Sequence, residues 1–199
     1  RAIVEGFPHA KLADPKGCAN CHAPHFSKNT HLLRDVMGKL CFPCHEPLSK
    51  EIAEAKYKHG AVEQNRCDSC HIAHGSGQPN LLAKEMTSDF YASYDPAKYS
   101  LCFNCHNPEL AMDEHTKAAT QFRNGDRNLH FVHVNRTEKG RTCRTCHATH
   151  ASNQPAHIRS GISFGQWTIP IEYTKTKTGG SCITGCHRER TYDRRTLQK

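Results

Sequence analysis

Every cysteine in this chain belongs to a close pair, and each pair is followed at once by a histidine. The chain has 199 residues, among them 12 Cys and 16 His. Five pairs have the spacing C-x-x-C-H, and the sixth has one more residue between its cysteines. The pairs are Cys18 and Cys21, Cys41 and Cys44, Cys67 and Cys70, Cys102 and Cys105, Cys143 and Cys146, and Cys182 and Cys186. Six such coincidences do not arise by chance, so this pattern constrains the fold more than any other feature.

A Cys-x-x-Cys-His segment is typical of covalent haem attachment, in which two thiols bind one haem and the histidine binds its iron. A scaffold of six disulfides does not require a histidine after each pair. Structural zinc sites do not require one either. The sequence therefore predicts six covalent haem c groups, each bound by one of the six cysteine pairs. Their proximal iron ligands are His22, His45, His71, His106, His147 and His187.

The apolar content is low for a chain of this length. Hydrophobic residues make up 36% of the sequence, which is little material for a core. We therefore expect the haems to fill the interior, and we expect the chain without haem not to fold. The predicted fold class is a haem-cored multihaem cytochrome c, mostly irregular or loop, with short α-helices and little β-structure.

Neither the termini nor the charge points to a membrane anchor or a nucleic-acid partner. No run of 18 apolar residues occurs, so we expect no transmembrane segment. The chain begins at Arg1 without an apolar signal region, so a signal peptide has been removed or never existed. The formal charge is +8. Two propionates on each of six haems bring it to about −4, and six ferric irons return it to about +2. Nucleic-acid binding is therefore not expected.

Three segments of the sequence align without gaps. They read CHAPHFSKNTHLL, CHIAHGSGQPNLL and CHATHASNQPAHI, and they begin at Cys21, Cys70 and Cys146. Each belongs to a C-x-x-C-H-x-x-H unit and is followed by a spacer and a second attachment site. This repeat predicts three two-haem modules, over residues 1–58, 59–129 and 130–199, within one compact domain spanning 1–199.

Six of the ten remaining histidines recur at equivalent positions in the modules, so we expect them to be distal iron ligands. Three precede the first attachment site of a module, and three lie three residues after its proximal histidine: His9, His59 and His133, and His25, His74 and His150. In each module the preceding histidine is expected to bind the first haem and the following one the second. His130 is an alternative to His133. His157 is a candidate extra ligand, including for a haem in another molecule, and His31 and His115 have no assigned role.

A few regular elements are also expected. Short helical turns should form at each attachment site. Ser49 would cap a helix over 50–58, and Asn107-Pro108-Glu109 would open a helix running to about Phe122. Alternation over 167–173 predicts a strand, which Pro170 would make an edge strand or an extended loop. The basic tail, residues 188–199, is expected to be solvated surface.

The three C-x-x-C-H-x-x-H units with their partner sites resemble the paired C-x-x-C-H family of multihaem c-type cytochromes. The resemblance implies haem attachment outside the cytoplasm and a role in anaerobic respiration. Family members with six haems include extracellular cytochromes of metal-reducing microbes that polymerise into conductive filaments. Others are periplasmic shuttles that feed terminal reductases or outer-membrane conduits.

These observations predict an electron-transfer protein with six low-spin, bis-histidine haems and no enzymatic activity. Bis-histidine iron has no open position for a substrate. The protein would act as a filament subunit, with His9 binding iron across a subunit boundary, or as a monomeric shuttle. Its partners would be redox proteins or an extracellular electron acceptor. The protein itself would be located outside the cytoplasm, either extracellular or at the cell surface, or in the periplasm. A multihaem reductase with one open haem is the alternative from another class, and a structural or metal-storage protein is a third.

Overall fold

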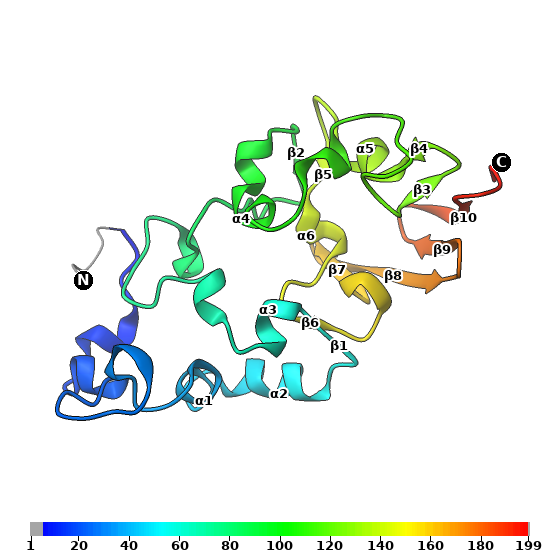
Figure 1. Cartoon of the computed structure of the whole chain (residues 1–199). Coiled ribbons are helices and arrows are strands. Elements are labelled where there is room, and N and C mark those ends of the chain that lie inside the picture. Colours follow the sequence, from blue (N-terminus) through cyan, green and yellow to red (C-terminus); the bar gives the residue numbers. More distant parts are fainter. Residues whose placement is uncertain (1–5, 199) are drawn as a thin grey trace. The chain divides into compact units, whose positions relative to one another are not determined.

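The computed structural model describes residues 6–198, which form two compact units (Figure 1). Unit 1 comprises residues 1–54 and 59–85, and unit 2 comprises 55–58 and 86–199. The first five residues of the first expected module and Lys199 of the expected tail lie outside the described residues. Residues 55–58 belong to unit 2 because Tyr57 and Lys58 pair with Ser152 and Ala151.

Unit 1 consists of short helices and turns. Its α-helices are α1 (Met37–Cys41), α2 (Glu46–Glu54) and α3 (Gly60–Glu63). Its 3-10 turns are η1 (Ala10–Ala13), η2 (Gly17–Asn20), η3 (Thr30–Leu32), η4 (Cys67–Ser69) and η5 (Pro79–Leu81). Few of its apolar side chains are buried, with Ile52 and Leu82 the largest among the described residues.

Unit 2 mixes helices and antiparallel sheets. Its helices and turns are η6 (Pro96–Tyr99), α4 (Ser100–Phe103), η7 (Pro108–Ala111), α5 (Leu129–Val134), α6 (Cys143–Cys146) and η8 (Pro155–His157). Its strands are β1 (Tyr57–Lys58), β2 (Tyr91–Ala92), β3 (Arg123–Asn124), β4 (Arg127–Asn128), β5 (Gly140–Arg141), β6 (Ala151–Ser152), β7 (Gly161–Phe164), β8 (Trp167–Lys175), β9 (Gly179–Thr184) and β10 (His187–Asp193). A small apolar cluster forms around Tyr99, Ala111 and Val134.

The expectation of little β-structure was wrong. Helices account for 31% of residues and strands for 24%, so the fold is mixed. Three two-stranded sheets accompany a four-stranded antiparallel sheet in the order β10-β9-β8-β7, visible in yellow to red in Figure 1. Most of the strand content that was not expected belongs to the four-stranded sheet. This sheet lies in the last third of the chain, where only one strand was expected.

The strand expected over 167–173 is present as β8, but it is not an edge strand. β8 lies between β7 and β9. Its first half pairs with β7 as far as Pro170, and its second half pairs with β9 from Ile171 onward. Proline is tolerated inside this sheet because it stands where the pairing changes sides, so its missing N–H interrupts no ladder bond.

The long helix expected after Asn107 was also wrong. Asn107 does cap the turn by accepting a bond from Glu109 N at 2.9 Å, but regular structure ends at Ala111. The fully buried Asn128 side chain donates to the carbonyls of Leu110 and Asp113, at 3.0 and 2.9 Å. Those carbonyls are the ones a longer helix would use, so a tertiary contact outcompetes local helix propensity.

Helix α2 differs from expectation, whereas the tail is mostly exposed, as expected, but also forms a strand. α2 starts at Glu46 rather than after Ser49, because the helix continues directly from the second attachment turn, where Ser49 N bonds to His45 O at 3.0 Å. It ends at Glu54, before strand β1. The first part of the tail forms β10. Tyr192 on this strand is buried, and its hydroxyl lies 2.7 Å from the hydroxyl of Tyr173.

Candidate functional site

Five of the six Cys-His attachment segments adopt the same tight turn. In each one the N–H of the proximal histidine donates to the carbonyl of the first cysteine, at 2.9 to 3.1 Å. The helical turns expected at these segments are therefore confirmed for the first five. Their proximal histidines are His22, His45, His71, His106 and His147. The bond brings both cysteines and the histidine to one short arc of backbone.

The sixth segment is built differently. Cys182 lies in β9 and His187 begins β10, so the segment is the turn of a β-hairpin rather than a helical turn. Cys186 N donates to Thr184 Oγ1 at 3.1 Å, and His187 pairs with Thr184 across the hairpin. The extra residue between these cysteines accompanies this change of backbone.

All twelve cysteines have free thiols. In unit 1, the thiols of Cys41 and Cys67 are within hydrogen-bonding reach, which raises the pKa of Cys41 and lowers the pKa of Cys67 to about 7. In unit 2, Cys102 and Cys143 make the same contact, which lowers the pKa of Cys102 and raises that of Cys143. Consecutive attachment sites therefore meet at their thiols within each unit.

Two further sulfur neighbours extend this arrangement. Burial and then the nearby Cys44 raise the pKa of Cys21. Burial and then the nearby Cys182 raise the pKa of Cys146 to about 11. The first three sites of the chain thus follow one another in unit 1, and the last three follow one another in unit 2.

The two cysteines of a site are not always equally buried, and the fourth site shows the difference. Cys105 is exposed, whereas its partner Cys102 is half-buried and lies against Cys143. Cys105 is nevertheless held in the attachment turn, because its N–H donates to the Cys102 carbonyl at 3.2 Å. A haem bound there would have one edge at the surface, and haem attachment to Cys105 stays a prediction from the sequence.

Three other cysteines share this exposure. They are Cys18, Cys44 and Cys186. Each belongs to a different attachment site, and the partner cysteine of each is half-buried. Four of the six pairs thus place one thiol toward the interior and the other at the surface, which is where haem could enter to react with both.

Three pairs of histidine rings face each other at nearly the same spacing. The ring centres of His22 and His74 are 6.0 Å apart. Those of His9 and His45, and those of His130 and His147, are 6.4 Å apart. Each pair contains one proximal histidine and one histidine from elsewhere in the sequence.

This spacing fits an iron atom bound from both sides. A metal–imidazole bond is about 2 Å long, and the ligating nitrogen lies about 1 Å from the ring centre, so two rings on opposite faces of one iron have centres roughly 6 Å apart. The residues present therefore fit haem iron with two axial histidines.

The environment of three of these rings, His9, His130 and His147, lowers the pKa and so favours the neutral form that a metal ligand requires. Burial lowers the pKa of His130 to about 3 and also lowers the pKa of His147. Burial, followed by the neighbouring His45, lowers the pKa of His9. The pKa of His133 is lowered by burial, and His187 is among the charges that act on it. His133 also stacks on Phe122, with 5.8 Å between the ring centres.

The doubled C-x-x-C-H motif is also found by comparison with known families. The family described as "Doubled CXXCH motif" matches residues 9–50 and 59–111. These segments contain the first four attachment sites and the histidines that precede two of them, His9 and His59. The matches support a multihaem c-type cytochrome. No match was found among curated proteins.

The observed ring pairs differ from the ligand pairs expected from the sequence. His9 faces the second proximal histidine of its module, His45, rather than His22. His74 faces His22, the first proximal histidine of the preceding module, rather than a site of its own module. Sequence position alone does not show which loop lies beside which, so it did not reveal these pairs.

His130 was expected only as an alternative to His133, and the structure places its ring beside His147. It stands with His133 on α5, three positions apart on one helix face, and Asn128 caps that helix through His130 N and Phe131 N. Thr120 Oγ1 lies 2.9 Å from His130 Nδ1, so the Nε2 side of the ring is free to face His147. Two histidines at helical spacing were the available signal.

The remaining histidines lie in varied surroundings. His25 and His31 are exposed, and His115 forms an ion pair with Asp126 at 3.4 Å. Burial and then His106 lower the pKa of His157, which therefore lies near a proximal histidine. His59 and His150 are half-buried and are the candidates left for the irons of the third and fourth sites.

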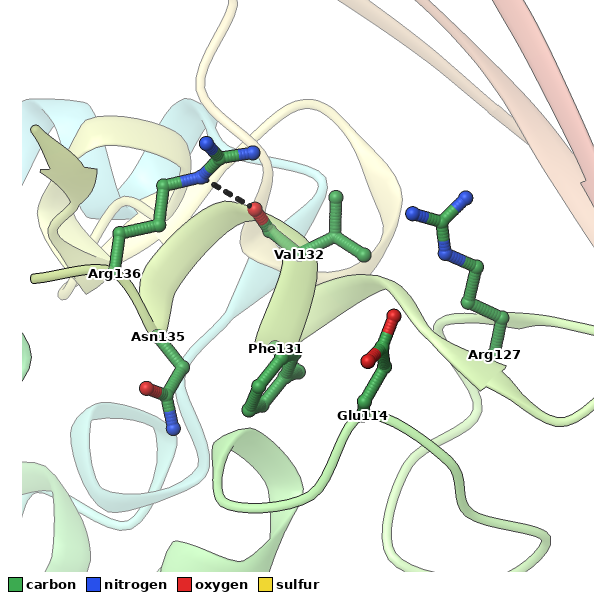
Figure 2. A pocket seen from close by; sticks show the side chains of 6 residues that line it. All are labelled: Glu114, Arg127, Phe131, Val132, Asn135 and Arg136. Carbon is green, nitrogen blue, oxygen red and sulfur yellow. Dashed lines mark hydrogen bonds between the residues drawn. The ribbon is translucent and has the colours of Figure 1, made fainter.

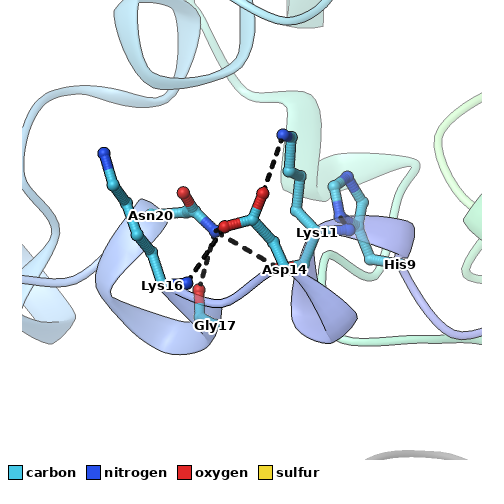
Figure 3. A network of polar contacts seen from close by, with 6 residues as sticks. All are labelled: His9, Lys11, Asp14, Lys16, Gly17 and Asn20. Carbon is cyan, nitrogen blue, oxygen red and sulfur yellow. Dashed lines mark hydrogen bonds and ion pairs between the residues drawn. The ribbon is translucent and has the colours of Figure 1, made fainter.

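A polar network ties His9 to the first attachment site (Figure 3). Asp14 accepts from Lys16 N at 3.0 Å and from Asn20 Nδ2 at 3.3 Å, and it pairs with Lys11 Nζ at 3.3 Å. Asn20 lies between the two cysteines of that site. Lys11 N also donates to His9 Nδ1 at 3.2 Å. Iron binding at Nε2 would put the ring proton on Nδ1, so this last contact must lengthen when haem is bound.

A pocket in unit 2 is separate from these groups (Figure 2). It is lined by Glu114, Arg127, Phe131, Val132, Asn135 and Arg136. Arg136 Nε donates to Val132 O at 2.9 Å, as the dashed line in Figure 2 marks. Its lining contains no cysteine or histidine, so it contributes no haem ligand. Among residues 6–198, no helix is long and apolar enough to cross a membrane.

Proposed function

We propose that this multihaem cytochrome transfers electrons through six covalently bound haems, each with two axial histidines. The observation that carries the proposal is the spacing of 6.0 to 6.4 Å between three proximal histidines and three distant ones. Bound haem supplies the one-electron Fe(III)/Fe(II) couple. The protein supplies the thiols, the two imidazoles and the order of the sites.

The order of the attachment sites supports transfer from haem to haem. Consecutive sites approach one another at Cys41 and Cys67 in unit 1, and at Cys102 and Cys143 in unit 2. Haems held at such neighbouring cysteines would lie edge to edge. Electrons would then pass along each unit in the order in which the sites occur in the sequence.

The presence of two candidate axial histidines for one iron is explained better by electron transfer than by catalysis. An iron with two axial histidines has no open position for a substrate, whereas a reductase requires at least one haem with a vacant side. The three ring pairs involve the proximal histidines His22, His45 and His147. We therefore propose no enzymatic activity, and a high-spin ferric absorption band in the purified protein would contradict this.

We further propose that the protein works outside the cytoplasm in anaerobic respiration, with redox proteins or an extracellular acceptor as partners. The motif resemblance is the support for this setting. A polymeric form is supported by the exposure of His25 and of Phe26, whose side chain is 80% exposed. The alternative is a monomeric periplasmic shuttle. Electron microscopy at high protein concentration distinguishes filaments from monomers.

Haem counting tests the central proposal. The protein is produced with a c-type haem attachment system, and haem per polypeptide is measured by pyridine haemochrome absorbance and by intact mass. We expect six haems and only low-spin ferric signals in electron paramagnetic resonance (EPR). A matched variant with Cys182→Ser and Cys186→Ser should contain five. A count of five or fewer in the parent protein would contradict the proposal.

A further inference from the structure

The three copies of the repeat close into the same loop after the first proximal histidine. In each loop the Nδ1–H of that histidine donates to the backbone carbonyl nine residues later. His22 bonds to His31 O at 2.8 Å. His71 bonds to Asn80 O at 2.9 Å, and His147 bonds to Ala156 O at 2.9 Å. These bonds fix the ring with Nε2 as the iron ligand.

The carbonyl is presented by an unusual backbone. The residue that offers it and the next residue both have positive φ in all three copies: His31/Leu32, Asn80/Leu81 and Ala156/His157, at 55° to 58°. Left-handed backbone is uncommon outside glycine and is strained, so it persists only where surrounding contacts hold it.

One serine hydroxyl in each loop holds this turn. Ser27, Ser76 and Ser152 each lie five residues after the proximal histidine and donate to the carbonyls of Leu33, Leu82 and Ile158. Each hydroxyl also accepts the N–H two residues further on, at 3.0 Å. Besides the cysteine and the two histidines, this serine is the one residue identical at the same place in all three loops. The hydroxyl therefore joins the start of the turn to its end.

We propose that Ser27, Ser76 and Ser152 are positioning residues that set the reduction potential of the three first-site haems. The Nδ1–H bond to a carbonyl raises the basicity of the imidazole, and a more basic ligand favours Fe(III) over Fe(II). The serine keeps that carbonyl in line with the ring. This inference rests on the proposed haem ligation, because it concerns the proximal ligands of those haems.

No second-site histidine has a serine at the equivalent position, because residues 50, 111 and 192 are Lys, Ala and Tyr. His45 runs directly into α2, and His187 Nδ1 lies 2.6 Å from the carbonyl of the next residue, Arg188. No serine follows a second-site histidine by five residues. Ser49 comes nearest, four residues after His45, and it contacts His45 through its backbone N. Ser49 therefore provides the matched control.

The test compares Ser27→Ala, Ser27→Thr and Ser49→Ala in the haem-loaded protein, by potentiometric titration with EPR detection. In Ser27→Ala we expect one midpoint to move to higher potential, by about tenfold in the Fe(III)/Fe(II) equilibrium, which is ~59 mV for one electron. Ser27→Thr keeps the hydroxyl and should titrate like the parent, as should Ser49→Ala.

Two results would overturn the inference. The first is a titration of Ser27→Ala that superimposes on the parent at equal haem content. The second is loss of one haem in Ser27→Ala and in Ser152→Ala without any midpoint shift, which would make the serine a purely structural residue. Failure of the proposed function is distinguishable, because the parent protein itself would then lack bound haem or low-spin signals.

Discussion

The rings of His22 and His74 face each other with 6.0 Å between their centres, although they belong to different copies of the repeat. His74 follows its own proximal histidine by three residues, yet its ring lies against His22 of the preceding copy. A haem bound between these two rings would join the two copies. The equivalent residue in the first copy, His25, is exposed instead.

This difference provides a matched pair of substitutions. His74→Ala should remove one axial ligand, and one of the low-spin ferric signals should be replaced by a high-spin signal in EPR. His25→Ala removes the equivalent side chain from the first copy and should leave all low-spin signals in place. The prediction fails if both variants give the same high-spin signal.

Removal of haem should abolish the fold. The larger side chains buried among the described residues are few, chiefly Ile52, Tyr99 and Tyr192, and this apolar area is small against the conformational entropy of a chain this long. Protein made without haem attachment should show no cooperative thermal transition by circular dichroism. A sharp transition in the haem-free chain would contradict this expectation, and the haem-loaded protein is the positive control.

The left-handed backbone at Ala156 predicts a stabilising glycine. Ala156 has φ of 55°, where glycine avoids the Cβ clash. We therefore expect Ala156→Gly to leave the spectrum unchanged and to raise the free energy of unfolding by up to about 1 kcal/mol. Ala53→Gly, on the exposed face of α2, should lower it by about 1 kcal/mol. A loss of stability in both variants would show that the left-handed turn is unstrained.

Acid should weaken the end of β10 through Asp193. Its carboxylate accepts from the Thr178 hydroxyl and from the N–H groups of Arg195 and Thr196, which lowers its pKa. A lowered pKa means that the ionised form stabilises the fold above the unfolded pKa, near 4, and that this stability is lost as the pH falls through the folded pKa. Asp193→Asn should therefore narrow the difference in melting temperature between pH 7 and pH 3.

The control for this pH dependence lies on the same strand. Glu189 is exposed on β10, and Glu189→Gln should keep the parental difference between the two pH values. An unchanged difference in Asp193→Asn would show that this carboxylate has no part in acid stability.

Local signals in the sequence predicted some elements well and others badly. The attachment turns and strand β8 were predictable, because both depend on neighbouring residues. The helix expected after Asn107 does not form, because the Asn128 side chain, which lies across a loop, donates hydrogen bonds to the carbonyls of Leu110 and Asp113. The four-stranded sheet was missed because its strands β9 and β10 carry the sixth attachment segment, which was expected to be a helical turn.

The sequence by itself determined the chemistry of this protein. The twelve thiols, the histidine after each pair and the threefold repeat are covalent facts of the chain, and they predict haem attachment without any coordinates. The tertiary structure decided which histidines face each other. Ligand pairs such as His9 with His45 and His130 with His147 depend on how distant loops pack. Residue spacing along a chain does not specify distance across a fold, so only the three-dimensional arrangement could pair them.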